Sequence, residues 1–285
     1  MSPPRPSRTA WQGLWLLAAA GCQAFIQPPD AALESLLKPV TTSPESVTLE
    51  LFHARIPLDK DHDADAFWQQ VDEQRFSVEL RRELVANGLR AGVVGAPLPS
   101  QLSDLLALES EAPDASTTRV IDGQTAVPRV TKRVLHVNRR DEKQIQASEL
   151  RDEATVLLSD GGAVGGKTFR EVQGVYVLRA ETAAGQRSRV RLTPELQHGE
   201  IKMRYAGSDQ GILLKTPSRE REVFDRLALE TELAPGELLV LGCFPEAKTS
   251  LGGLFHTASA AGQDERKLIV LRLVQVPPSE ILAAK

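Results

Sequence analysis

Two neighbouring stretches decide the fold: Val172-Gln173-Gly174-Val175-Tyr176-Val177-Leu178 and Ser188-Arg189-Val190-Arg191-Leu192-Thr193-Pro194-Glu195-Leu196. Both are rich in β-branched and apolar residues, and the second alternates apolar with polar positions, as strands do. Working outward, further strands are expected at Val130–Val137, Thr155–Leu158, Glu200–Tyr205, Arg226–Leu233, Leu238–Leu241 and Lys267–Val276. Because no long helix separates these strands, residues 119–277 are expected to form an antiparallel sandwich or a barrel-like sheet.

A small α/β unit is expected before this β domain, over residues 46–108. Its elements are expected in the order strand, helix, helix, strand, helix, at Val47–Leu51, Asp65–Gln74, Val78–Ala86, Leu89–Val94 and Leu102–Leu106. Ser77 is a suitable N-cap for the second helix, and Asn87-Gly88 is a typical helix end. The acidic and polar residues 109–118 are expected to link the two parts, so the fold class is α+β.

The composition is that of an ordinary globular protein. The chain has 285 residues, of which 41% are hydrophobic and 25% charged, and this length suits one large or two modest domains. The formal net charge is −4, and the sequence contains no long basic stretch. Because phosphate binding needs clustered Lys and Arg, nucleic acid is not expected as a partner.

The first 21 residues are typical of an export signal peptide. Arg5 and Arg8 precede a short apolar run, residues 14–20, which is too short to span a membrane. Ala19-Ala20-Gly21-Cys22 then resembles the lipobox of bacterial lipoproteins, which implies that Cys22 is acylated and becomes the first residue of the mature chain. A plain secretory signal with an incidental Cys22, and a cytoplasmic protein, are the alternatives.

Residues 22–45 are expected to form a lipid-anchored tether, since they carry several prolines, and residues 278–285 a tail. Gln23 follows the cysteine where an inner-membrane retention signal prefers Asp, so the resemblance implies the outer membrane, with the protein facing the periplasm. Acylation of Cys22 would leave Cys243 as the one remaining cysteine, and no internal disulfide is expected.

One stretch matches the phosphate-binding loop pattern G-x-x-x-x-G-K-[ST] through Gly161, Gly166, Lys167 and Thr168. Phosphate binding requires a helix directly after the loop, because the amides at its N-terminus hold the phosphate. Gly174 and a strand-like segment follow too soon for such a helix. The match is therefore interpreted as a coincidence within a glycine-rich hairpin loop.

A second stretch, Asp59-Lys60-Asp61-His62-Asp63-Ala64-Asp65, alternates carboxylates like the start of a calcium loop. An EF-hand loop needs Gly at its sixth position and Glu at its twelfth, and Ala64 and Gln70 stand there instead. A solvated acidic loop is expected, and weak cation binding by Asp59, Asp61 and Asp63 is the alternative.

Other chemistry-bearing residues form no recognisable site. The five histidines, His53, His62, His136, His198 and His256, have no metal-ligand spacing among themselves or with Cys243. Asp72 and Glu73 are adjacent and would not share a helix face. Cys243 is expected to be buried and inert. No serine or cysteine nucleophile motif is present, so no catalytic residue, cofactor or metal is expected.

The C-terminal part shows an ordered series of segments. They are Arg189–Leu196 followed by Gly199, then Leu227–Leu233, Pro235–Gly242, Leu251-Gly252-Gly253-Leu254-Phe255 and Glu265–Leu271. This series, over residues 150–276, resembles the C-terminal domain of bacterial secretins, the ring-forming outer-membrane gates of secretion and pilus systems. Cys243 stands where that family usually has a second glycine, and Phe244–Ser250 is too short for its gate segment. The resemblance therefore implies a shared fold more than a shared pore.

These observations favour a non-enzymatic envelope lipoprotein, a structural or interaction component of an outer-membrane or secretion-related assembly. The membrane is expected as a partner through the lipid, and a second copy or another envelope protein through β-augmentation at an edge strand such as Leu268–Val274. The alternative is a periplasmic lipoprotein that binds a small ligand or polysaccharide, which requires a concave pocket with convergent polar groups.

Overall fold

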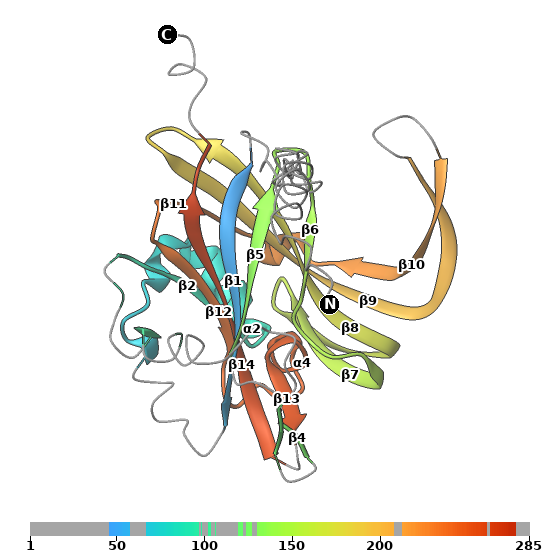
Figure 1. Ribbon diagram of the computed structural model, residues 1–285. Coiled ribbons are helices and arrows are strands. Elements are labelled where there is room, and N and C mark those ends of the chain that lie inside the picture. The colour runs from blue at the N-terminus through green and yellow to red at the C-terminus, as the bar shows by residue number, and fades with distance from the viewer. Residues whose placement is uncertain are drawn as a thin grey trace, which may run out of the picture. The chain divides into compact units, whose positions relative to one another are not determined.

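Antiparallel strands dominate the part of the chain that the computed structural model describes, namely residues 46–57, 67–96, 98, 102–103, 106, 119–121, 124–126, 130–207, 213–260 and 263–277 (Figure 1). The strands are β1 Val47–Pro57, β2 Leu89–Val94, β3 Arg119–Ile121, β4 Gln124–Ala126, β5 Val130–Val137, β6 Lys143–Gln146, β7 Arg151–Asp160, β8 Ala163–Ala183, β9 Arg187–Gly207, β10 Leu213–Val223, β11 Leu229–Leu233, β12 Leu238–Cys243, β13 Thr257–Ala260 and β14 Gln263–Gln275. The helices are α2 Val78–Ala86 and α4 Leu251–His256, with 3-10 turns η2 Glu73–Arg75 and η3 Asp225–Leu227. The expected strand-rich α+β class is confirmed.

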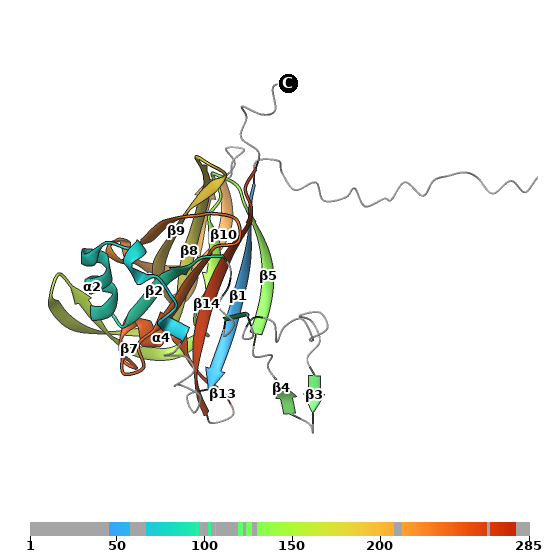
Figure 2. The same cartoon turned by 90° about the vertical axis from the view of Figure 1, so that its left-hand side faces the viewer.

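The strands form two main sheets and a small hairpin. The first sheet has the order β2-β12-β14-β1-β5, with β13 also paired to β14. The second has the order β10-β9-β8-β6, with β11 paired to β9 and β7 paired to β8, while β3 pairs only with β4. Figure 2 shows β14, β1 and β5 side by side in one layer, with the strands of the second sheet beside it.

Strands from both sides of the expected linker share the first sheet. β1 lies between β14 and β5, and β2 pairs with β12. Residues 46–57 and 89–94 therefore complete the sheet of the β domain instead of closing a sheet of their own. Contacts group the described residues, all of which follow residue 45, into one unit. The signal peptide, the tether up to residue 45, the linker 109–118 and the tail 278–285 lie outside the described residues.

The core lies between the two sheets, and a second apolar cluster covers the other face of the first sheet. On β14, Ile269, Leu271 and Leu273 point into the core, while Leu268 and Val270 point to the second cluster. That cluster contains Phe67, Trp68, Leu102 and Leu106 from the N-terminal part. Because both faces are covered, the strand is a continuous apolar run, and each fully buried side chain contributes about 1.5–3 kcal/mol.

The prediction that Leu268–Val274 is an edge strand is wrong. β12 pairs with one side of β14 from Leu238↔Arg272 to Leu241↔Ile269, and β1 pairs with the other side. Nearer its start, β14 has β13 in place of β12. The hydrogen-bonding groups of this strand are therefore engaged on both sides, and β14 is central to the sheet.

The helices of the N-terminal part are only partly as expected. Ser77 caps α2 by accepting a hydrogen bond from the amide of Leu80 at 3.2 Å, and Gly88 ends it with φ of +71°. The helix expected over residues 65–74 does not continue past Trp68. The chain turns there, and Asp72 forms a two-way backbone bridge with Val93. Of the third helix, the structure describes helical residues at 102, 103 and 106, with Leu102 and Leu106 buried.

The second sheet has longer strands than the sequence suggests. The segments expected as two strands, Ser188–Leu196 and Glu200–Tyr205, form one continuous strand, β9. β8 extends from Ala163 to Ala183 and includes Gly166, Lys167 and Thr168 of the phosphate-loop-like stretch. The strand β10 was not expected, because its sequence is largely charged and polar.

Candidate functional site

The residues singled out in the sequence fall into two groups. Cys22 lies outside the described residues, as do Asp59, Asp61 and Asp63 of the acidic loop. Within the described ranges, no cluster of three or more His, Cys, Asp or Glu side chains is placed to hold a metal ion. Nor does any described helix have the length and apolar character needed to cross a membrane.

The phosphate-loop-like residues lie in the β7–β8 hairpin. Gly161 and Gly162 form its two-residue turn with φ of +57° and +92°, which suits glycine, and Asp160 pairs with Ala163 across it. Gly166, Lys167 and Thr168 lie in β8, which runs on as a strand where a phosphate loop would open a helix.

The side chains of this stretch have partners within the protein. The Lys167 ammonium forms an ion pair with Glu222 of β10 and lies 5.0 Å from the ring centroid of Phe169. The Thr168 hydroxyl is 2.9 Å from that of Thr155 across the hairpin. The stretch thus connects β8 to both β7 and β10, and its lysine faces a carboxylate of the same chain.

Cys243 and His256 are both buried, at 4% and 0% exposure. The Cys243 thiol lies 3.8 Å from the backbone carbonyl of His256. Burial lowers the pKa of His256 to about 3, although its hydrogen bond to the Lys267 carbonyl opposes that shift. Burial also raises the pKa of the neighbouring Tyr176 well above its ordinary value. His256 and Tyr176 are therefore uncharged at neutral pH.

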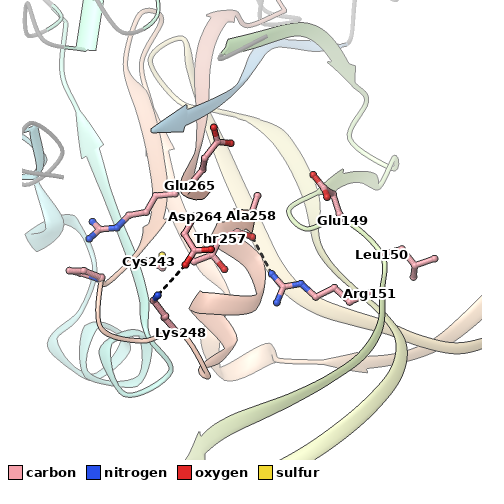
Figure 3. Close-up of a pocket in the computed structure, with 11 residues that line it drawn as sticks. Glu149, Leu150, Arg151, Cys243, Lys248, Thr257, Ala258, Asp264 and Glu265 are labelled. Carbon is pink, nitrogen blue, oxygen red and sulfur yellow. Dashed lines mark hydrogen bonds and ion pairs between the residues drawn. The ribbon is translucent and has the colours of Figure 1, made fainter. Parts of the chain in front are cut away.

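A recess of about 400 Å³ lies beside this buried group, between the segment after β6 and the start of β14 (Figure 3). It is lined by Glu149, Leu150, Arg151, Cys243, Pro245, Lys248, Thr257, Ala258, Asp264, Glu265 and Arg266. Lys248 forms an ion pair with Asp264 at 3.1 Å, and Arg151 donates to the Thr257 carbonyl at 3.1 Å. The lining contains three acidic and three basic side chains, so the recess has no strong preference for either sign of charge.

A different feature stands out on the second sheet, where β9 and β10 continue as a two-stranded ribbon. We use the term ribbon for residues 200–207 of β9 and 213–218 of β10, which pair from Leu213↔Gly207 to Ser218↔Lys202. The pairing of β9 with β8 ends at Gln173↔Gln197. Beyond that point, no described strand other than β10 pairs with β9. Figure 1 shows the ribbon curving away from β8.

The ribbon carries exposed apolar side chains. Ile201 is 60% exposed and Met203 is 58% exposed, and they share one face because side chains alternate along a strand. Glu200 and Lys202, on the opposite face, are also exposed. Within the described chain, the ribbon from residue 200 to 203 therefore contributes to no core.

The base of the ribbon is fixed to the body. Gly199 bends β9 with φ of +74°, and the register shifts between Ser218 and Glu220 of β10. At this bend the Arg219 guanidinium donates to the Gly199 carbonyl and forms an ion pair with Glu171 of β8. Arg219 thus sets the direction in which the ribbon leaves the sheet. Only a weak signal for this surface is present in the sequence, namely apolar residues that alternate with charged ones in a charged segment.

Comparison with known proteins gives little further information. No protein-family model matches the chain, and no curated protein matches it. Among solved structures, the chain is similar to one described as the InvG secretin domain β-barrel from the Salmonella SPI-1 injectisome NC-base. The match has 13% sequence identity, covers 84% of this chain and 67% of that one, and has a TM-score of 0.20.

Proposed function

We propose that this chain is a non-enzymatic lipoprotein of the bacterial envelope that takes part in an assembly through the ribbon. The proposal of an assembly rests on the ribbon, a paired extension of the second sheet with exposed apolar residues on one face. The proposal of an envelope location comes from the sequence, where an export signal precedes the lipobox-like Ala19-Ala20-Gly21-Cys22.

Physical reasons favour a partner for the ribbon. A two-stranded hairpin that packs on nothing is at best marginally stable in water, and exposed apolar side chains on it favour association. The β9 edge beyond Gln197 also presents backbone N–H and C=O groups with which no described strand pairs. Such an edge is a template for β-augmentation by another chain.

The partner that fits this geometry is a second copy of the same chain. The ribbon has two outer edges, one on β9 and one on β10, and no described strand pairs with either. Copies that associate through unlike edges can continue around a closed ring, whereas a single shared edge would stop at a dimer. The sequence resemblance to secretins is consistent with a ring. Because Phe244–Ser250 is too short for the gate segment of that family, we propose an assembly without a gate.

Acylation tests the proposed location. Cells that express the full chain are fed a labelled palmitate analogue and separated into soluble and membrane fractions. The proposal predicts that the chain is labelled and found with membranes, and that Cys22→Ala is unlabelled. An intact, unlabelled chain in the cytosol would contradict the envelope role.

Thiol protection tests the proposed contact. In Ile201→Cys, the new cysteine would be the one reactive thiol, because Cys243 is buried and Cys22 would be acylated. The matched control is Val134→Cys, since Val134 is an exposed apolar residue of β5, outside the ribbon, with 52% exposure. In membranes, a maleimide polymer should modify the cysteine at 134 quickly and the one at 201 slowly, and a detergent that separates the copies should remove the difference. Equal rates before and after detergent would argue against a contact at the ribbon.

A further inference from the structure

The inner face of the first sheet changes from apolar to polar at one end, on three neighbouring strands. On β1, the buried Leu49 and Leu51 are followed on the same face by His53 and Arg55. On β5 the corresponding change runs from the buried Val137 and half-buried Leu135 to Arg133 and Thr131, and on β14 from Ile269 to Lys267. Adjacent strands therefore contribute polar side chains to the same end of this inner face.

A cleft of about 660 Å³ lies at this end. Its lining comes from β1, β5, β14, β6 and the segment after β6: Leu51, His53, Arg55, Thr131, Arg133, Leu135, Lys143, Gln144, Ile145, Gln146, Ala147, Ser148, Glu149 and Lys267. The lining of the cleft contains four basic side chains and one carboxylate, whereas the recess of Figure 3 has equal numbers of acidic and basic side chains. The volume is within the range of small-molecule sites.

Two of the four cations already have carboxylate partners. Arg55 forms ion pairs with Glu149 at 3.3 Å and Glu265 at 3.7 Å, and Lys143 forms one with Asp141 at 3.5 Å. For Arg133 and Lys267, the structure shows no ion pair with any described residue. Arg55 and Lys143 thus have carboxylates of their own within ion-pair distance, whereas the carboxylate of Glu149 acts on Lys267 from farther away.

Lys267 has an unusual position for a lysine. Only 6% of it is exposed, and it lies directly opposite Arg55 in the β1–β14 pairing. Directly opposed like charges repel each other, because their Cβ atoms are about 4.5–5.5 Å apart. Burial of an ammonium without a partner is also unfavourable. A bound anion would relieve both costs.

We propose that this cleft binds a small organic anion, with its carboxylate or phosphate group between Lys267 and Arg133. Thr131 and His53 stand opposite each other between those two cations, and the Thr131 hydroxyl can donate a further hydrogen bond to the acid group. Leu51 and Leu135 supply an apolar surface for the carbon skeleton of the ligand. Lys267 gives the charge, and the guanidinium of Arg133 can bind an acid group through two parallel hydrogen bonds.

His53 is a natural reporter of binding. Its Nε2 lies 3.0 Å from the Gln146 carbonyl, and since a carbonyl only accepts, this nitrogen carries the proton. Burial, together with the charges of Lys267, Arg133 and Arg55, lowers the pKa of His53. An anion beside these cations would cancel part of their repulsion and raise that pKa.

The proposed affinity depends on pH through Lys267. Burial lowers the pKa of Lys267 to about 8. The charged and titratable groups that face Lys267 are Arg55 and His53 on β1, Glu149 and Arg151 after β6, Cys243 on β12 and His256 at the end of α4. A bound anion favours the charged ammonium, so binding is expected to weaken as the pH rises above about 8.

The experiment follows the imidazole resonances of the intact chain by NMR during titration with inorganic phosphate, citrate and glucuronate. Sodium chloride at matched ionic strength and methyl glucoside are the controls for screening and for a neutral sugar. His136 serves as the internal control, because it lies on the opposite face of the first sheet, where its Nδ1 is 3.3 Å from the Thr48 hydroxyl. The phosphate and carboxylate titrations distinguish the two kinds of acid group.

The proposal predicts a saturable shift of His53 with at least one of the acids and none of His136. Lys267→Met, which keeps the volume but removes the charge, should weaken the binding by about tenfold or more, equivalent to about 1.4 kcal/mol. Lys132→Met is the matched control on the outer face of the same sheet, where Lys132 pairs with Glu50, and should leave binding unchanged. Absence of a His53 shift with all three acids, equal shifts of His53 and His136, or unchanged binding by Lys267→Met would each overturn the proposal.

Discussion

The Tyr176 hydroxyl lies 2.8 Å from Nε2 of His256, and both side chains are almost completely buried. The other ring nitrogen, Nδ1, is 2.9 Å from the Lys267 carbonyl, so Nδ1 carries the proton and Nε2 accepts from the tyrosine. Tyr176 belongs to β8 and Lys267 to β14. The imidazole at the end of α4 therefore connects the second sheet to the first through two hydrogen bonds inside the core.

Because of this bridge, the free energy of unfolding is expected to depend on pH in the acidic range. The pKa of His256 is lowered from 6.5 to about 3 in the fold, so between these values the unfolded chain binds a proton that the folded chain does not. The free energy of unfolding is then expected to fall by about 1.4 kcal/mol for each pH unit below 6.5. Urea unfolding at several pH values measures this, with His256→Gln as the comparison because glutamine stays neutral. The wild-type slope should exceed that of His256→Gln, and equal slopes would contradict a neutral buried imidazole.

Asn87 fastens the β7–β8 hairpin to the end of α2. Its side-chain amide donates to the Ser159 carbonyl at 3.0 Å and accepts from the Ser159 amide at 2.9 Å, as a neighbouring strand would. It is only 1% exposed. Asn87→Ala is therefore expected to lower the free energy of unfolding by about 1–3 kcal/mol, because it leaves the partly buried backbone groups of Ser159 unpaired.

A second variant separates the two hydrogen bonds of Asn87. Asn87→Asp keeps the oxygen that accepts from Ser159 but replaces the donor with a second oxygen, which would face the carbonyls of Ser159 and Glu83. At neutral pH it should be at least as unstable as Asn87→Ala in chemical denaturation. A variant as stable as the wild type would show that the amide does not hold the hairpin.

Gly252 of α4 allows close packing on the α2–β2 turn. A Cβ at Gly252 would lie 2.0 Å from the Gly88 carbonyl oxygen, and a backbone atom cannot easily move away. Gly252→Ala is thus expected to destabilise the fold by about 1–3 kcal/mol or more, as overpacking does. Gly165→Ala is the control, since nothing lies within 4 Å of the added Cβ. Thermal unfolding should show a clear loss for the first variant and a near-normal midpoint for the second.

Local sequence patterns predicted individual elements well. The alternation of apolar and polar residues at Val47, Leu49 and Leu51 predicts β1. Ser77 and Asn87-Gly88 predict the two ends of α2. Both succeed because alternation and capping depend only on neighbouring residues. The same patterns could not give the position of β14 in its sheet. Its apolar run from Leu268 to Leu271 fits a central strand, but only the pairing with β1 and β12 shows that it is one.

The candidate surfaces depend on contacts that the sequence does not show. Arg55 and Lys267 face each other across β1 and β14 although they are far apart in the chain, so a search for local clusters of charge misses them. The sequence pattern predicts Glu200–Tyr205 as a separate strand because Gly199 interrupts the apolar pattern, whereas in the structure β9 continues through Gly199. The helix expected over residues 65–74 failed for a related reason, since the backbone of Asp72 pairs with Val93 of β2.

The native mass of the chain, extracted in a mild detergent that preserves protein contacts, tests the central claim, self-association through the ribbon, most directly. Light scattering on the wild type, the double variant Ile201→Asp with Met203→Asp, and the control Val134→Asp would compare these surfaces under one condition. We expect a multiple of the single-chain mass for the wild type and the control. The double variant should have the mass of one chain, because two carboxylates disfavour burial of that face. A single-chain mass for the wild type at high concentration, or an unchanged multiple for the double variant, would contradict the account.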